Sequence, residues 1–149
     1  MKLLFATNLA EPLAVTETVQ NLANRLEAEL LVLHVYIPTP SSAMPIDPMT
    51  GFGDFAAYSL YDPEIEHNIE RAEEHEFEGF VKERFTRPIR PALIKGDPGT
   101  VILADAEEHD VDLIILGKRH HGRLERLLLG SVTGYVVEQA VRPVLLMPL

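Results

Sequence analysis

The sequence contains no cysteine among its 149 residues. Disulfide bonds, thiol nucleophiles and metal sites built from cysteine are therefore excluded. Positive charge is scarce as well, because 13 lysine and arginine residues stand against 23 acidic ones, for a formal net charge of −10. Phosphate backbones and anionic membranes select basic surfaces, so this balance favours neither nucleic-acid binding nor binding to a membrane surface.

Long apolar runs are also missing. We see no transmembrane span and no signal peptide, and we expect a cytoplasmic protein. Two common phosphate-binding motifs, Gly-x-x-x-x-Gly-Lys-Ser/Thr and Gly-x-Gly-x-x-Gly, do not occur. The chain does have 46% hydrophobic residues, enough for one core. We therefore expect residues 1–149 to form a single domain.

Short apolar runs alternate with helical patterns along the chain. The runs predict strands at residues 2–7, 30–35, 90–95, 113–116 and 144–147. Apolar spacings of three and four residues predict helices that begin near Pro12, Pro63, Pro98 and Val132. This order predicts an α/β fold: an open, five-stranded, mostly parallel sheet with helices on both faces. Pro91 places the third strand at an edge.

Residues 36–62 interrupt this alternation. They contain several prolines and glycines, which prevent a long regular element, together with methionine and aromatic side chains. A segment of this length is either a flap over a site or a partner contact, or a variable excursion that packs on the surface.

The fourth strand leads into the strongest candidate site. The strand stops at Gly117, and a glycine-rich, basic loop runs from there to Gly130 and Ser131, just before a helix. Free N–H groups at a helix N-terminus attract phosphate, and glycines let the backbone approach a ligand closely. Ser131 could cap the helix or donate its hydroxyl to a phosphate. The same pattern is also compatible with a plain helix cap and solvated loop charges.

The topology gives this loop a place in the sheet. In open α/β sheets, ligands bind outside the carboxyl ends of strands, where the strand order reverses. If the first and fourth strands are neighbours, Asn8 lies near Gly117 and Gly130.

The remaining polar candidates point to no catalytic or metal centre. His34 lies in a strand and is expected to be a packed, hydrogen-bonded core residue. His120 and His121 are adjacent in the loop and have no third ligand at a matching spacing, so no metal site is predicted. We find no acid–base pair and no nucleophile with a base, so we do not expect an enzyme.

The motifs, taken in order, resemble the universal stress protein family. The resemblance rests above all on the segment from Arg126 to Val132 and on Arg142-Pro143-Val144-Leu145. Leu33-His34-Val35, Gly96-Asp97-Pro98 and the strand before Gly117 support it. It covers nearly the whole chain and is weakest over residues 37–62. The resemblance implies a Rossmann-like fold and a homodimer paired through the last strand, Val144 to Met147.

Within that family, the nucleotide-binding branch holds ATP on a Gly-x-x-Gly-x9-Gly-Ser/Thr loop. Gly117 matches the first glycine and Gly130-Ser131 the last pair, while His120 replaces the middle glycine and Gly122 lies nearby. Asn8 stands where ATP-binding members usually carry aspartate, and an amide oxygen can still accept a hydrogen bond.

The resemblance therefore implies ATP as a cofactor, with or without Mg²⁺ or Mn²⁺. The residues expected to hold it are Thr7, Asn8, Val35, Leu116, Gly117, Arg119, His120, Gly122, Arg123, Gly130, Ser131, Val132 and Thr133.

Two functions are consistent with the sequence. The first is an ATP-binding regulatory homodimer of the stress response that acts on an unknown protein partner. The alternative is a dimeric stress protein that binds no nucleotide and acts through protein–protein contacts alone.

Overall fold

A computed structural model describes residues 1–37, 63–118 and 130–148 of the chain. Five parallel strands form one sheet in the order β3-β2-β1-β4-β5. The strands are β1 (Lys2–Thr7), β2 (Glu29–Tyr36), β3 (Arg90–Lys95), β4 (Leu113–Lys118) and β5 (Val144–Pro148). The helices are α1 (Leu13–Arg25), α3 (Pro63–Arg84), α4 (Pro98–Glu108) and α5 (Ser131–Gln139). The predicted α/β fold is confirmed.

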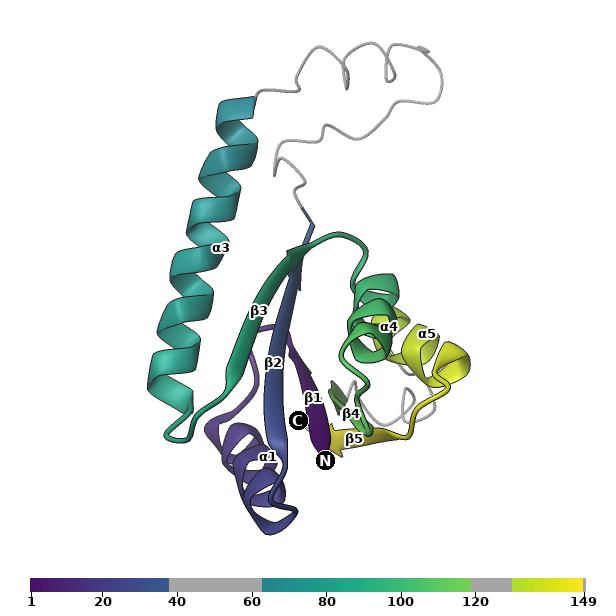
Figure 1. Cartoon of the computed structure of the whole chain (residues 1–149). Helices are drawn as coiled ribbons and strands as arrows, with labels where there is room; N and C mark the ends of the chain where they lie inside the picture. The colour runs from purple at the N-terminus through teal and green to yellow at the C-terminus, as the bar shows by residue number, and fades with distance from the viewer. Residues whose placement is uncertain (38–62, 119–129, 149) are drawn as a thin grey trace, which may run out of the picture.

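The sheet separates two apolar cores (Figure 1). On one face, α1 and α3 cover Phe5 and Val32, and on the other face α4 and α5 cover Leu4 and Leu33. Neighbouring residues of one strand pack into opposite cores because side chains alternate along a strand. Both faces are buried, which explains why the central strands are continuous apolar runs without polar alternation.

Several elements extend beyond their predicted bounds. Tyr36 belongs to β2 and not to the following segment, because β3 pairs with it in the register Tyr36–Lys95. β4 continues through Gly117 to Lys118, where it pairs with Pro148. The rest of the predicted loop 36–62, apart from Tyr36 and Ile37, lies outside the described residues.

The strand order reverses between β1 and β4. From β1 the chain first builds outward to β2 and β3, and later fills the other side with β4 and β5. The first and fourth strands are neighbours, which was the condition for bringing Asn8 near Gly117 and Gly130, and Ala6 lies opposite Leu116 near their carboxyl ends. The edges of the sheet are β3 and β5, as Pro91 and the final strand predicted.

The helices of the described residues differ from membrane spans in length or in hydropathy. None of them is both long and apolar enough to cross a bilayer. The longest, α3, carries glutamates along most of its length.

Candidate functional site

A cleft of about 380 Å³ opens where the strand order reverses. It brings together these predicted site residues: Thr7, Asn8, Val35, Leu116, Gly117, Gly130, Ser131, Val132 and Thr133. They come from β1, β2, β4 and the start of α5, so no single stretch of sequence forms the cleft. The other predicted residues, Arg119, His120, Gly122 and Arg123, lie outside the described residues.

The cleft also has lining residues that the sequence did not single out. They are Ala6, Glu11, Leu33, Pro98 and Ile102. Pro98 and Ile102 belong to the first turns of α4, which covers this face of the sheet. Glu11 matters most among these residues, because it brings a carboxylate that is only 4% exposed to the cleft. Its one sequence signal is its position, shortly after a strand end and directly before Pro12.

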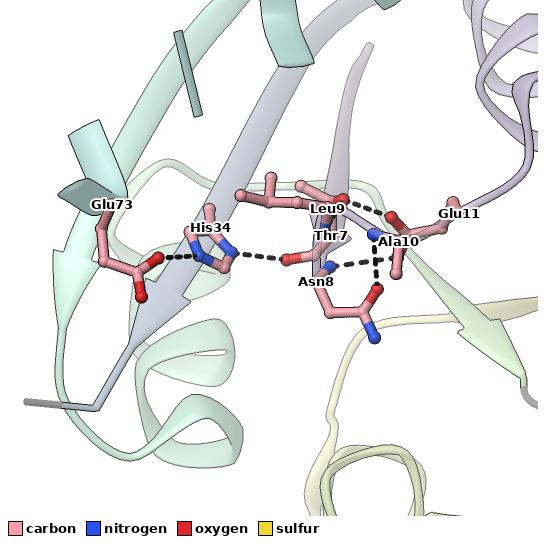
Figure 2. Close-up of polar contacts among 7 residues, drawn as sticks. All are labelled: Thr7, Asn8, Leu9, Ala10, Glu11, His34 and Glu73. Atoms are coloured by element: carbon pink, nitrogen blue, oxygen red, sulfur yellow. Dashed lines mark hydrogen bonds and ion pairs between the residues drawn. The ribbon is translucent and has the colours of Figure 1, made fainter. Parts of the chain in front are cut away.

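Glu11 closes a hydrogen-bonded turn at the end of β1 (Figure 2). Its Oε2 accepts a 2.5 Å hydrogen bond from the Thr7 hydroxyl, and its Oε1 accepts a 3.0 Å bond from the N–H of Asn8. The N–H of Leu9 donates to Oγ1 of Thr7 at 2.9 Å. A buried carboxylate is tolerated here because both of its oxygens accept hydrogen bonds.

This turn holds Leu9 in a left-handed conformation, with φ of 66°. Such a conformation costs a residue with a side chain roughly 1–2 kcal/mol. Leu9 nevertheless packs against the core formed with α1 and α3, and the surrounding hydrogen bonds offset the cost. These hydrogen bonds hold the turn in one conformation, and the turn forms part of the cleft wall.

The turn also orients the side-chain amide of Asn8 at this wall. Its Oδ1 accepts the N–H of Ala10 at 3.1 Å, which identifies the oxygen of the amide. The exposed Asn8 side chain therefore has its Nδ2 group free of this turn (Figure 2). The amide oxygen keeps a second lone pair, so its expected role as an acceptor for a ligand stays a prediction.

The opposite wall of the cleft is the N-terminus of α5. Gly130 is the N-cap residue, so of the two roles considered for Ser131 the helix cap is excluded and the hydroxyl donor to phosphate stays a prediction. Gly130 has no side chain with which to satisfy the first N–H groups of the helix, and these groups lie at the cleft. By contrast, α4 is capped by Asp97, whose side chain accepts the N–H of Thr100.

The conformation of Gly130 does not require glycine. Its φ is −56°, and a Cβ at this position would meet no atom of the described residues within 4 Å. What glycine provides here is close access to the helix N-terminus. A ligand could therefore approach the backbone without displacing a side chain.

The electrostatics of the cleft distinguish its two ends. The α5 N-terminus carries partial positive charge, whereas the end of β1 carries the carboxylate of Glu11. Between them the walls are apolar, from Leu33, Val35 and Ile102. The cleft therefore suits a ligand that has an anionic end for α5 and a flat, weakly polar end for the sheet.

His34 is buried and hydrogen-bonded, as predicted. It is 8% exposed and bonds to Thr7 and Glu73. Within the described part of the chain, no group of three or more acidic or histidine side chains could hold a metal ion.

Several known proteins are similar to this chain in sequence or in fold. The model of the universal stress protein family matches residues 1–148. A universal stress protein of Thermus aquaticus is 32% identical over 119 residues, which cover 80% of this chain and 77% of the relative.

Two solved structures share the fold. The structure of MJ0577, a universal stress protein of Methanocaldococcus jannaschii, superposes with a TM-score of 0.70 at 22% identity and covers 99% of this chain and 95% of its own. A universal stress protein in complex with cAMP has a TM-score of 0.58 at 18% identity, with 99% of this chain and 96% of the other covered.

Proposed function

The chain belongs to the universal stress protein family, and we propose that it is an ATP-binding regulatory homodimer of the stress response. The observation that carries the nucleotide part is the uncapped N-terminus of α5. It opens into the cleft at the point where the strand order reverses. Ligands of open α/β sheets bind at this point.

The described residues fit the two ends of an adenine nucleotide. The phosphates would bind the first N–H groups of α5 and the Ser131 hydroxyl, because this end of the cleft is positive. The base would lie between the apolar side chains of Leu33, Val35 and Ile102. Glu11 repels phosphate from the β1 end, and this repulsion favours one orientation of the ligand.

A divalent cation would enter with the nucleotide. The described residues hold no metal cluster, so Mg²⁺ or Mn²⁺ would be bound mainly by phosphate oxygens. The relative that was solved with cAMP makes this second adenine nucleotide a useful competitor. It has the same base but one phosphodiester group in place of the triphosphate.

A binding role is favoured over catalysis. Glu11 is the one carboxylate among the described residues of the cleft, and both its oxygens accept hydrogen bonds in the turn. The described lining therefore offers no acid–base pair. We propose that ATP changes the dimer or its surface, and through them the binding of a protein partner.

Calorimetry with purified protein tests the nucleotide assignment. The protein is denatured and its supernatant assayed for bound nucleotide, and refolded or ligand-free protein is titrated with ATP and with cAMP, with and without Mg²⁺. We expect ATP binding that Gly130→Leu abolishes, since the new side chain would cover the α5 N-terminus. No copurified nucleotide and no heat at millimolar ATP would refute the assignment.

Gly79→Leu is the matched control. Gly79 lies in α3, away from the cleft, and a Cβ there also meets no atom within 4 Å. It should leave the affinity for ATP at the wild-type value. If Gly130→Leu binds ATP as the control does, the phosphate site lies elsewhere.

The alternative function, a stress protein without nucleotide, is favoured by one observation. The oxygen of Asn8 is engaged by Ala10, so the end of β1 presents a less complete acceptor set than an aspartate would. In this case ATP produces no heat, and the dimer and its partner contacts form equally well in the absence of nucleotide.

A further inference from the structure

A second hollow of the molecule lies away from the cleft, between α3 and the edge strand β3 (Figure 1). It is a groove of about 770 Å³, larger than the cleft at the N-terminus of α5. Its apolar surface comes from Phe77 and Val81 of α3 and from Pro91 and Leu93 of β3. The proposed nucleotide binding gives this groove no role.

The strand β3 has free main-chain groups along this groove. The N–H of Gly96 donates to the carbonyl of Tyr36 at 3.0 Å, so the even-numbered residues of this stretch turn their main-chain groups towards β2. The groups of the odd-numbered residues point away from the sheet. Since Pro91 has no N–H, the free set begins with its carbonyl and continues with the groups of Leu93 and Lys95. Within the described part of the chain, no strand pairs with this side of β3.

The helix side of the groove carries a row of carboxylates. Every fourth residue of α3 along the groove is a glutamate: Glu66, Glu70, Glu74 and Glu78. Four residues of an α-helix rise about 6 Å, and side chains on one face of a strand are about 6.5 Å apart. The carboxylates therefore follow nearly the same repeat as the side chains of a strand that lies along β3.

The charge of the groove favours a basic partner. Its two lysines stand against the four glutamates, and Lys95 is already ion-paired with Glu66. The exposed carboxylates of Glu74 and Glu78 form no ion pair with another described residue. Lysine or arginine at every second position of an added strand would meet these carboxylates, and complementary charges of this kind select one partner over another.

We propose that the groove between α3 and β3 binds an extended, basic segment of a partner protein, which adds to the sheet as a further strand beside β3. Main-chain hydrogen bonds to Leu93 and Lys95 provide affinity, and alternate basic side chains that face α3 provide specificity. The proposed dimer pairs through β5, at the opposite edge of the sheet, so both copies keep this groove. The docking site goes beyond the proposed nucleotide binding and does not depend on it.

A synthetic peptide probes the groove. It has the length of β3, six residues, and alternates lysine with valine. Titrated into the protein without nucleotide, it should shift the amide signals of Leu93 and Lys95 in NMR spectra. A peptide of the same composition with its lysines grouped together should bind more weakly, because only the alternating order places the charges on one face. Equal binding of the two peptides, or shifts confined to other elements, would overturn the proposal.

Two double variants test the role of the carboxylates. Replacement of Glu74 and Glu78 by glutamine should weaken binding of the alternating peptide roughly three- to tenfold, the effect of two exposed ion pairs. Replacement of Glu76 and Glu83 by glutamine changes the net charge equally, at exposed positions of α3 outside the groove, and should leave the affinity at the wild-type value. Calorimetry measures both affinities. If the two double variants lose the same affinity, the peptide follows the net charge of the protein, and the groove is not its site.

A proline at the end of β3 tests the main-chain pairing. Lys95→Pro removes an outward N–H and keeps the bonds to β2, whereas Lys95→Ala removes the same ammonium group and keeps the N–H. The peptide should bind Lys95→Pro more weakly than Lys95→Ala, and equal affinities would show that it does not pair with β3. If Lys95→Pro fails to fold, the glutamine variants decide.

Light scattering on the two Lys95 variants identifies a different occupant. A monomeric Lys95→Pro protein beside a dimeric Lys95→Ala protein would assign the groove to a second copy of this chain and overturn the proposal. Unchanged dimers with reduced peptide binding support it. None of these titrations contains nucleotide, so a failure of ATP binding and a failure of the docking site are observed separately.

Discussion

Two buried carboxylates show how differently single residues are accommodated in this protein. Glu11 is 4% exposed, and each of its oxygens accepts a hydrogen bond. Asp105 on α4 is 5% exposed, but its Oδ2 has no partner among the described residues. Burial raises the pKa of Asp105, and Glu108 adds to the rise, whereas His109 and Arg90 oppose it. Its charged form is therefore costly in the folded protein.

The pH dependence of stability should reveal this cost. A raised pKa in the folded state contributes stability below the ordinary aspartate value, near 3.9, that is lost as pH rises through the folded pKa. We expect Asp105→Asn to remove this loss and to raise the free energy of unfolding at about pH 7 by about 1 kcal/mol. Urea denaturation across this pH range measures both effects. Asp110→Asn changes an exposed carboxylate nearby and is the control. It should not remove the loss of stability with rising pH.

Tyr36 should limit stability at alkaline pH. Burial raises the pKa of its hydroxyl, and the charges of Glu70 and Glu74, a hydrogen bond to Glu70 and the charge of Glu73 raise it further. The resulting stability is present below the ordinary tyrosine pKa of about 10 and is lost as pH rises through the folded value. Tyr36→Phe should remove this alkaline loss, whereas Tyr135→Phe, at a 44% exposed ring, is the control.

Absorbance titration can assign the cause at the same residue. Of the three glutamates, Glu70 raises the pKa of Tyr36 most, through its charge and a hydrogen bond, so Glu70→Gln should lower this pKa towards its ordinary value. The difference spectrum between this variant and its Tyr36→Phe derivative isolates the ring. An unchanged pKa in Glu70→Gln would show that Glu70 contributes little, and that burial together with Glu73 and Glu74 raises the pKa of Tyr36.

At the scale of elements, the packing of α4 against α5 determines the shape of the cleft. Both helices contribute lining residues, through Pro98 and Ile102 on one side and the segment from Gly130 to Thr133 on the other. They approach closely at Gly99, where an added Cβ would lie 2.5 Å from the ring of Tyr135. The absence of a side chain at Gly99 is therefore a packing requirement between two helices.

Two glycine-to-alanine substitutions should have opposite effects on stability. Gly99→Ala would push the Tyr135 ring outward and lower the free energy of unfolding by about 1 kcal/mol. Gly79→Ala, in the middle of α3 where a Cβ meets nothing, should raise it by about 0.5–1 kcal/mol. Denaturant unfolding of the two variants measures the contrast. Equal effects would mean that α4 and α5 adjust without cost.

At the scale of the whole molecule, the sheet has two edges, and the proposed dimer uses one of them. Just before β5, the carbonyl of Pro143 accepts from the N–H of Ile114, so alternate main-chain groups along the strand point towards β4. Leu145 and Met147 share this direction, whereas the N–H groups of Val144 and Leu146 point outward. An exposed row of such groups favours pairing with a second strand.

A proline in β5 should separate dimerisation from folding. Leu146→Pro removes an outward N–H group and leaves the bonds to β4 intact, so we expect a folded monomer by light scattering. Leu146→Ala, which loses apolar packing but keeps the N–H group, should remain dimeric. Leu145→Pro removes a bond to β4 and should destabilise the fold. A dimeric Leu146→Pro protein would place the interface elsewhere.

The sequence by itself determined the elements and their order in this protein. Apolar runs predict the strands, and spacings of three and four residues predict the helices, because both patterns follow from local geometry. Asp97 and Pro98 predict the start of α4, and Asp97 is the observed cap. The sequence left the adjacency of the first and fourth strands as a condition, and the observed strand order meets that condition and gives the cleft its place.

Only the tertiary structure decided how the cleft is built. Glu11 enters it because the turn at Leu9 adopts a positive φ that no periodicity encodes. His34 meets Glu73 because α3 packs over β2, far along the chain, and the turn, not the residue type, determines how the Asn8 amide is oriented. Hydrophobic patterns report which face of an element is buried. The direction of a polar side chain depends on partners distant in sequence, so it is known only once the chain has folded.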